Sequence, residues 1–432
     1  MSPMKLSVIG TGYVGLVTAA CFADLGHHVV GMDRDTERIR MLKSGAVPFY
    51  EPGLAELLHR VQQAGRLEFT TDIADAVRES DVIFITVGTP AREGGDADMS
   101  AVVSVAEGIA GALTDHRLIV EKSTVPVRTG ERIRDQIHLL TRGAVPFDVA
   151  CNPEFLREGS AIHDFLHPDR IVLGVTSERS ERLLRELYAP LECPILVTDL
   201  TTAELIKHAS NAFLAMKISY INAVAAICER VGADIRQVAD GMGYDRRIGR
   251  AFLDAGVGYG GSCFPKDVAA FIRIAQEAGY KFHLLEEVAR INEAQREVLV
   301  RHLIDALWVL DNRTITVLGL AYKPNTDDVR EAPAIPIIER LCREGAVVRA
   351  YDPAAEANAR QLLPGITYCP DPYEAARGSD AVVLLTEWDE FRSLDLVRLR
   401  EIMRRPVLID GRNLLDPRAA RALGFHYAGI GR

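Results

Sequence analysis

A cysteine in a glycine-rich segment is the strongest chemical signal in this sequence. The segment 256–267 reads GVGYGGSCFPKD, and its four glycines let the backbone approach a ligand closely. Pro265 suits the first turn of a helix, which places Cys263 at or next to a helix N-terminus. Unpaired amides, the helix dipole and Lys266 favour a thiolate there, and a thiolate is a nucleophile. Asp267 follows on the same helical face, so the pair indicates covalent catalysis followed by hydrolysis. The alternative is a buried cysteine at a glycine-rich turn.

A lysine and an asparagine lie four residues apart in a long apolar stretch. Lys207 and Asn211 offer a cation and an amide donor to a developing alkoxide, as an oxyanion clamp does. The alternative for the lysine is an exposed charge on the helix surface. The segment 152–159 (NPEFLREG) follows an expected strand. It offers Glu154 as a base and a run of backbone amides for a phosphate or a sugar, but spacing alone only suggests this role.

The segment 10–15 (GTGYVG) has the G-x-G-x-x-G spacing of a dinucleotide-binding loop. It follows the apolar run Leu6–Ile9 and opens a helical pattern, which is the context that this motif requires. Gly10 permits the tight turn, and Gly12 lets a pyrophosphate approach the backbone at a helix N-terminus. Gly15 lets the helix pack closely on the strand. The alternative is a glycine turn with no ligand.

Further candidate ligand contacts follow the ends of later strands. Asp33 ends the next expected strand, 18 residues after Gly15, where an acid binds the ribose hydroxyls and repels a 2′-phosphate. NAD is therefore favoured over NADP, although Arg34 offers a partner for such a phosphate. Thr89 and Thr124 stand in the segments VGTP and KSTVP, each of which ends an expected strand. Ligands bind beyond the carboxyl ends of strands in open sheets, so both threonines are candidate contacts; the alternative is a simple turn.

Alternating strand and helix patterns indicate how these residues are positioned. In the first part of the chain the expected strands are Leu6–Ile9, Val29–Met32, Val82–Val87, Leu118–Glu121 and Ile171–Val175. The helices between them include Leu16–Leu25, Glu37–Lys43 and Ser100–Leu113. This alternation is typical of a parallel, doubly wound sheet.

The middle of the chain is helical, and the strand–helix alternation then restarts. Thr201–Val231 lacks Pro and Gly and predicts one helix about 45 Å long, with two shorter helices as the alternative. The other elements expected from here on are helices at Val268–Glu277, Leu284–Trp308 and Ala334–Glu344, and strands at Thr314–Gly319, Val347–Tyr351, Ala381–Leu385 and Val407–Ile409. We predict an α/β protein with two Rossmann-like doubly wound domains joined by a long central helix. The expected boundaries are 1–200 for the first domain, 201–310 for the central helical dimerisation region and 311–432 for the second domain.

Composition excludes several classes of protein. The chain has 432 residues, of which 48% are apolar, too many for a mainly disordered chain. Its formal net charge of −10 lacks the basic footprint of a nucleic-acid-binding protein. No uninterrupted apolar run approaches the roughly 18–20 residues of a membrane span, and no signal peptide precedes the first strand, so we expect a cytoplasmic protein. The seven cysteines form no C-x-x-C pair, which argues against a disulfide framework or a zinc site.

Six motifs resemble those of the UDP-glucose/GDP-mannose dehydrogenase family, in the same order and over essentially the whole chain. They are the segments 10–15, 122–126, 152–159, 207–211, 258–267 and 318–330. The resemblance implies NAD as the cofactor. It also implies a four-electron oxidation, in which C6 of a nucleotide sugar passes from alcohol to carboxylate and two NAD are reduced. The cofactor contacts are then expected from Gly10, Gly12, Tyr13, Val14, Gly15, Asp33, Thr89, Thr124 and Lys266.

By the same resemblance, the catalytic residues are Cys263, Lys207, Asn211, Asp267, Glu154 and Thr124. The cysteine forms a thiohemiacetal and then a thioester that water hydrolyses. The lysine and the asparagine stabilise the oxyanions, and the lysine is also linked to the first deprotonation. The two carboxylates handle water, and the threonine is associated with that water. The implied substrate contacts are Phe155, Leu156, Arg157, Glu158, Lys207, Asn211, Arg247, Tyr259, Gly260, Lys323 and Arg412, the last two from the second, UDP-binding domain.

The resemblance also implies partners. Arg247 matches an arginine that reaches the substrate of a partner subunit, which implies a homodimer or a larger assembly built on the central helix. The segment 258–267 is most similar to the UDP-glucose branch, so UDP-glucose is the expected substrate and GDP-mannose or another nucleotide sugar the alternative. A two-electron hydroxyacid dehydrogenase would not need Cys263, and a non-catalytic NAD or nucleotide-sugar sensor would need no nucleophile. No nucleic acid, membrane or metal is expected.

Overall fold

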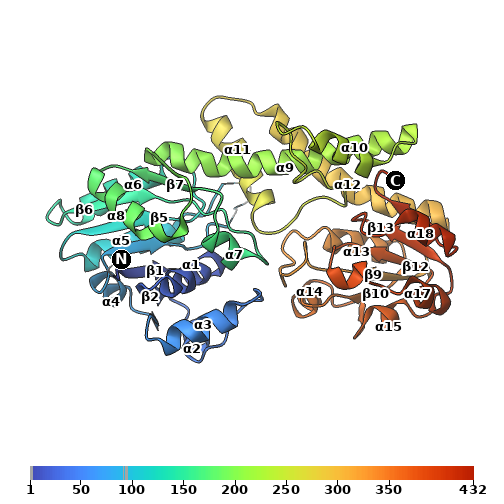
Figure 1. Cartoon of the computed structure of the whole chain (residues 1–432), viewed down its shortest axis with the longest axis horizontal. Coiled ribbons are helices and arrows are strands. Elements are labelled where there is room, and N and C mark those ends of the chain that lie inside the picture. Colours follow the sequence, from blue (N-terminus) through green and yellow to red (C-terminus); the bar gives the residue numbers. More distant parts are fainter. Residues whose placement is uncertain (1–2, 91, 93–95) are drawn as a thin grey trace. The chain divides into compact units, whose positions relative to one another are not determined.

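The computed structural model describes residues 3–90, 92 and 96–432 (Figure 1). The predicted first domain begins at Met1, which lies outside the described residues. The chain forms two compact units: Met1–Ser210 with Ala269–Ala278, and Asn211–Val268 with Gly279–Arg432. The predicted fold class is confirmed, because each unit contains a mainly parallel sheet in an alternating α/β order. The predicted boundaries of the three regions stay a prediction.

The sheet of the first unit has eight strands in the order β3-β2-β1-β4-β5-β6-β7-β8. The strands are β1 (Lys5–Ile9), β2 (His28–Met32), β3 (Leu67–Thr70), β4 (Val82–Ile85), β5 (Arg117–Glu121), β6 (Phe147–Cys151), β7 (Ile171–Val175) and β8 (Ile195–Thr198). All neighbours run parallel except β6 and β7, which are antiparallel. The strand order reverses between β1 and β4, and such a switch point is where doubly wound sheets bind their ligands.

Helices cover both faces of this sheet. They are α1 (Tyr13–Asp24), α2 (Thr36–Lys43), α3 (Leu54–Gln63), α4 (Ile73–Arg78), α5 (Ser100–Ala112), α6 (Thr129–Leu140), α7 (Ala161–Leu166), α8 (Glu178–Tyr188) and the short 3₁₀ helix η1 (Ala189–Leu191). Strand β4 shows why both faces are needed: Val82 and Phe84 belong to one apolar cluster, whereas Ile83 and Ile85 belong to another. Alternate residues of a strand point to opposite faces, so the sheet lies between two hydrophobic cores.

The second unit repeats this architecture with six parallel strands in the order β11-β10-β9-β12-β13-β14. The strands are β9 (Thr314–Leu318), β10 (Val347–Tyr351), β11 (Thr367–Tyr368), β12 (Ala381–Leu384), β13 (Val407–Asp410) and β14 (His426–Gly429). Its helices are α10 (Ile235–Gly243), α12 (His283–Leu307), α13 (Ala334–Arg343), α14 (Glu356–Leu362), α15 (Pro372–Ala376), α16 (Asp389–Arg392), α17 (Leu396–Ile402) and α18 (Pro417–Ala422). One large apolar cluster, from Val257 to Tyr427, packs this unit.

Two helices, α9 and α11, contribute residues to both units. Helix α9 (Leu200–Val231) is continuous, so the predicted single helix is confirmed and the alternative of two shorter helices is wrong (Figure 1). Helix α11 (Phe264–Glu277) begins directly after Cys263. Within the described part of the chain, α9 alone is long and apolar enough to cross a membrane by length and composition. Of its most apolar window, 44% is buried inside the structure.

Four strands were not expected from the sequence, namely β3, β8, β11 and β14. They are the outermost strands of the two sheets. Strand β3, with the sequence LEFT, has its glutamate exposed, and β11 is only two residues long. Strand β8, with the sequence ILVT, has a short apolar run, but its Leu196 is 50% exposed. Edge strands are half solvated, so their local signal is weak.

Candidate functional site

The glycine-rich loop between β1 and α1 is shaped for close approach of a ligand. Gly10 has φ +102°, which favours glycine, and a Cβ on Gly15 would lie 1.8 Å from the carbonyl oxygen of Gly10. A Cβ on Gly12 would meet open space instead. Tyr13 and Val14 then open α1. Gly12 therefore leaves room for a pyrophosphate at the helix N-terminus, and the loop fits a dinucleotide.

Asp33 follows β2 and is oriented by the same loop. Its Oδ2 accepts hydrogen bonds from the Thr11 amide at 2.9 Å and from the Thr11 hydroxyl at 3.0 Å. Arg38 is the cation that pairs with it, at 3.4 Å, whereas Arg34 is exposed. The carboxylate is thus held at the end of β2, where the ribose of a dinucleotide binds in this fold.

The two predicted threonines are brought together by a hydrogen bond. The Thr89 hydroxyl, beyond the end of β4, donates to the Thr124 carbonyl, beyond the end of β5, at 2.7 Å. These strands are neighbours in the sheet. Both threonines therefore lie at its carboxyl edge, as the spacing predicts for ligand contacts.

Lys207 on α9 forms a buried ion pair with Glu154. The ammonium lies 3.0 Å from the Glu154 carboxylate, and only 4% of Lys207 and 7% of Glu154 are exposed. The interpretation of Lys207 as an exposed surface charge is therefore wrong. The other Glu154 oxygen accepts from the Leu156 amide at 2.6 Å, so this carboxylate also shapes the predicted substrate segment. Two cations lie near the Phe155 ring, with Arg170 at 3.5 Å and Lys207 at 5.4 Å from its centroid.

The rest of the predicted substrate segment lies at the surface of the first unit. Arg157 pairs with Asp164, with its Nη2 2.6 Å from a carboxylate oxygen. Glu158 is half-buried in the turn that follows. This segment leads directly into α7.

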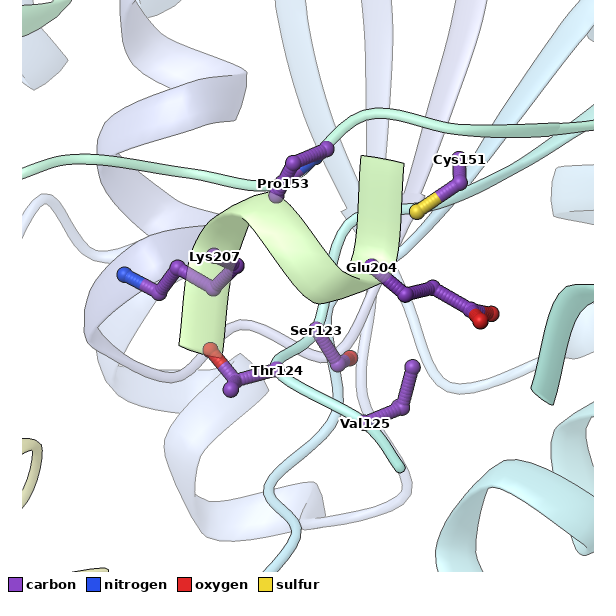
Figure 2. Close-up of a pocket in the computed structure, with 7 residues that line it drawn as sticks. All are labelled: Ser123, Thr124, Val125, Cys151, Pro153, Glu204 and Lys207. Atoms are coloured by element: carbon purple, nitrogen blue, oxygen red, sulfur yellow. The ribbon is translucent and has the colours of Figure 1, made fainter. Parts of the chain in front are cut away.

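A small pocket in the first unit brings several of these residues together. It is lined by Ser123, Thr124, Val125, Cys151, Pro153, Glu204 and Lys207 (Figure 2). Burial raises the pKa of the Cys151 thiol well above its usual value, so this cysteine stays protonated and is no rival nucleophile. Lys122, from the same segment as Thr124, donates to Asn152 at 3.0 Å, and burial lowers its pKa to about 8.

Two residues of α9 that sequence reasoning missed hold the Thr124 segment in place. Glu204 accepts hydrogen bonds from the amides of Arg128 at 2.5 Å and Gly130 at 2.7 Å. Burial raises its pKa to about 7 despite these bonds. The His208 ring contacts the Val125 carbonyl at 2.7 Å. Glu204, Lys207 and His208 stand at positions i, i+3 and i+4 of the helix, so their side chains lie near one helical face. This spacing is the signal that could have identified Glu204 and His208.

The second unit holds the predicted nucleophile. Cys263 is exposed and directly precedes α11, and the Ser262 hydroxyl lies 3.7 Å from its sulfur. Asp267, one turn later, is 1% exposed, and its amide donates to the Cys263 carbonyl at 2.8 Å. The Asn211 amide group donates to the Asp267 carboxylate at 2.6 Å, and the Lys266 ammonium pairs with the same carboxylate at 2.8 Å. The predicted oxyanion donor, Asn211, is therefore hydrogen-bonded to the predicted water-handling acid, Asp267.

The glycines before Cys263 pack against other parts of the second unit. A Cβ on Gly260 would lie 2.2 Å from the Glu331 carbonyl oxygen, and Gly258 has φ +98°. The main chain of Tyr259 exchanges two hydrogen bonds with the Asn292 side chain, at 2.8 and 3.0 Å. Arg412 donates to the Gly258 carbonyl at 3.0 Å. Burial raises the pKa of Tyr259 to about 12, so its phenol stays neutral.

Three cationic substrate candidates, Arg412, Lys323 and Arg247, lie in the same unit but differ in their surroundings. Arg412 also donates to the Tyr322 carbonyl at 3.2 Å, and the Lys323 ammonium lies 5.3 Å from the Tyr322 ring, so these two cations share one neighbour. Arg247 has 88% of its side chain exposed and pairs with Asp245. The structure does not join Arg247 to the other candidates in this unit that it describes.

Comparisons with known proteins identify the family. Residues 4–192 match the NAD binding domain of the UDP-glucose/GDP-mannose dehydrogenase family, residues 201–294 its central domain and residues 316–417 its UDP binding domain. The chain is 50% identical to UDP-glucose 6-dehydrogenase TuaD of Bacillus subtilis, over 99% of this chain and 93% of that protein.

Solved structures agree with this assignment. A UDP-glucose dehydrogenase from Pyrobaculum islandicum matches with a TM-score of 0.93 and 41% identity, over 100% of this chain and 98% of that one. A UDP-D-ManNAc dehydrogenase from Pyrococcus horikoshii matches with a TM-score of 0.88 and 30% identity, over 99% of both chains. The chain belongs to the UDP-glucose/GDP-mannose dehydrogenase family and is an NAD-dependent dehydrogenase.

Proposed function

We propose that this enzyme oxidises UDP-glucose at C6 to UDP-glucuronate, with reduction of two NAD for each sugar. The relative that is 50% identical bears the name of this activity, and so does the structure with the TM-score of 0.93. The observation that carries the proposal is Cys263, exposed directly before α11, with a buried Asp267 one turn later. A two-electron dehydrogenase needs no such thiol.

The dinucleotide loop, Asp33, Thr89 and Thr124 would hold NAD, with Lys266 as a further contact from the predicted set. Bound NAD supplies the hydride acceptor for each of the two oxidations. This chain's own task in the first oxidation is to remove the proton of the C6 hydroxyl and stabilise the alkoxide. The Glu154 carboxylate, which the sequence offers as a base, can take this proton. The Lys207 ammonium beside it can stabilise the alkoxide, because this cation is desolvated and held by Glu154.

Cys263 acts on the aldehyde that the first oxidation leaves. Its sulfur adds to the aldehyde carbon, and the carbonyl oxygen takes up a proton to give a thiohemiacetal. Loss of the C6 hydrogen as hydride and of the hydroxyl proton converts this adduct into a thioester. Water then attacks the thioester, the C–S bond breaks, and the carboxylate and the cysteine thiol are released.

Asn211 and Asp267 serve the later steps. The amide of Asn211 is a donor for the oxyanion that forms at C6 in each addition, and its bond to Asp267 orients it. The Asp267 carboxylate takes the proton of the attacking water.

A stoichiometric titration tests this function. With limiting UDP-glucose and excess NAD, we expect two NADH per sugar, measured by the absorbance of NADH. Cys263→Ser should lose this yield, because a serine hydroxyl does not form the adduct that the second oxidation requires. Cys342→Ser, which changes another exposed cysteine, is the matched control and should keep it.

Other yields would redirect the proposal. Two NADH from GDP-mannose or UDP-ManNAc but none from UDP-glucose would keep the chemistry and replace the sugar. One NADH per sugar, unchanged by Cys263→Ser, would refute the covalent mechanism.

We also propose that the enzyme is a homodimer or a larger homo-oligomer in the cytoplasm. Phe213, Tyr220 and Ile227 lie seven residues apart on α9 and are 58%, 53% and 57% exposed. About two helical turns separate each of these residues from the next, so the three side chains form one apolar stripe in the second unit. Large exposed apolar patches mark interaction surfaces, and a second copy of the same helix is a matching partner.

Charged substitutions on this stripe should separate the subunits. We expect Phe213→Asp/Tyr220→Asp to sediment as a monomer in analytical ultracentrifugation, because two carboxylates would be buried at the interface. Leu139→Asp, at an exposed leucine outside this stripe, should sediment as the wild type does. A wild-type enzyme that sediments as a monomer would contradict the proposal.

A further inference from the structure

A buried glutamate ties the cofactor loop to the sugar segment of the first unit. Glu51 is 6% exposed and lies in the loop between α2 and α3. Its Oε2 accepts a hydrogen bond from the Gly159 amide at 2.6 Å, and its Oε1 accepts from the Ala161 amide at 2.8 Å. The Tyr13 hydroxyl donates to the same carboxylate. Donors from two parts of the chain that are far apart in the sequence, Tyr13 and the pair Gly159 and Ala161, therefore share one acceptor group.

Two of these donors belong to the two predicted ligand-binding segments of the first unit. Tyr13 is the fourth residue of the dinucleotide loop, and Gly159 ends the predicted substrate segment. The Gly159 amide also lies 3.2 Å from the Tyr13 hydroxyl, which adds a direct bond between the two segments. Ala161 begins α7, so Glu51 holds both ends of the turn that follows the substrate segment.

The chemistry of the contact requires a carboxylate. An ionised carboxylate offers only acceptors, so it can meet three N–H and O–H donors at once. Burial and the Glu51 charge raise the pKa of Tyr13 above its usual range, so the phenol keeps the proton that it donates. A glutamine of the same shape would turn an NH₂ group toward one of these donors and lose at least one bond.

We propose that Glu51 is a positioning residue that couples NAD binding to nucleotide-sugar binding. When a bound sugar fixes the conformation of the segment that ends at Gly159, the hydrogen bonds of Glu51 also fix the position of Tyr13. The dinucleotide loop is then held in its binding conformation. The inference rests on the proposed function, because it takes a nucleotide sugar as the ligand of this segment. A purely structural role for Glu51 would lower stability without changing how one ligand affects the other.

Equilibrium binding measures this coupling without turnover. The dissociation constant of NADH is determined by fluorescence, without and with saturating UDP-glucose; no oxidant is present, so no reaction occurs. For the wild type we expect UDP-glucose to tighten NADH binding about 5-fold or more, the usual range of coupling between sites. In Glu51→Gln the ratio should fall to about one. Glu56→Gln, the same change at an exposed residue of α3, should keep the wild-type ratio.

A second variant guards against misfolding. Tyr13→Phe removes only the hydroxyl, leaves both amide bonds to Glu51 in place, and should also reduce the ratio. A wild-type ratio in either Tyr13→Phe or a folded Glu51→Gln would overturn the proposal, as would a wild-type enzyme in which the sugar leaves NADH binding unchanged. If calorimetry shows that UDP-glucose does not bind at all, the proposed substrate is wrong, and the same titrations with GDP-mannose and UDP-ManNAc decide the role of Glu51.

Discussion

Replacing Lys207 by methionine should lower kcat for UDP-glucose oxidation by about 10²–10³-fold, the effect of removing one donor from an oxyanion site. Methionine is an unbranched side chain only one atom shorter than lysine, but it lacks the cation proposed to stabilise the developing alkoxide. The substitution also leaves the Glu154 carboxylate buried without the ammonium that lies 3.0 Å from it. Breaking a buried ion pair in this way costs about 3–5 kcal/mol. Steady-state kinetics measures the first effect, and urea unfolding measures the second.

A double variant separates catalysis from stability. Lys207→Met/Glu154→Gln removes both charges, so it should recover part of the unfolding free energy without recovering activity. Lys43→Met makes the same chemical change at an exposed residue and should alter neither quantity. If the double variant regains wild-type kcat, Lys207 acts only through stability, and its assignment to the chemistry is wrong.

The second large effect is expected at Asp267. Replacing it by asparagine should slow thioester hydrolysis by about 10²–10⁴-fold, because an amide cannot take the proton of the attacking water. The earlier steps do not need this carboxylate as a base, so the covalent adduct on Cys263 should accumulate. Rapid mixing should then show a burst of NADH that is proportional to the enzyme, and intact-protein mass spectrometry should show the acylated chain.

Two controls define what this adduct means. Cys263→Ser/Asp267→Asn should show no added mass, because the nucleophile is absent. Asp305→Asn changes an exposed aspartate and should turn over as the wild type does. A slow Asp267→Asn enzyme without burst and without adduct would mean that Asp267 acts before the thioester forms, through its bonds to Asn211 and Lys266.

The interior of both sheets could be predicted from the sequence, and the edges could not. Strand β7 has the predicted bounds, and β4 differs from the prediction only at its end. Interior strands of a parallel sheet are buried on both faces, so they form continuous apolar runs that a local pattern reveals. Of the four outermost strands, β8 has an apolar run of only three residues and the others have a shorter one, so their pairing is decided by the neighbouring strand that they meet.

The local backbone geometry around the predicted site residues was likewise readable from the sequence. The dinucleotide loop requires glycine for reasons of backbone geometry, and the start of α11 after Cys263 follows from Pro265. These are constraints between residues that are close in sequence. The family resemblance then added the expected roles of Lys207, Asn211, Asp267 and Glu154.

Only the tertiary structure decided which charges are buried and what they bind. Lys207 reads as either a surface lysine or a clamp until Glu154, 53 residues away, is seen against it. Glu51 has no local signal at all, because its partners lie 38, 108 and 110 residues away. Local sequence determines backbone geometry and apolar periodicity, whereas the partner of a polar side chain depends on how distant segments pack. The sequence by itself therefore determined the fold class and the local setting of the predicted nucleophile, whereas the packing of distant segments decided which polar and charged side chains pair in each unit.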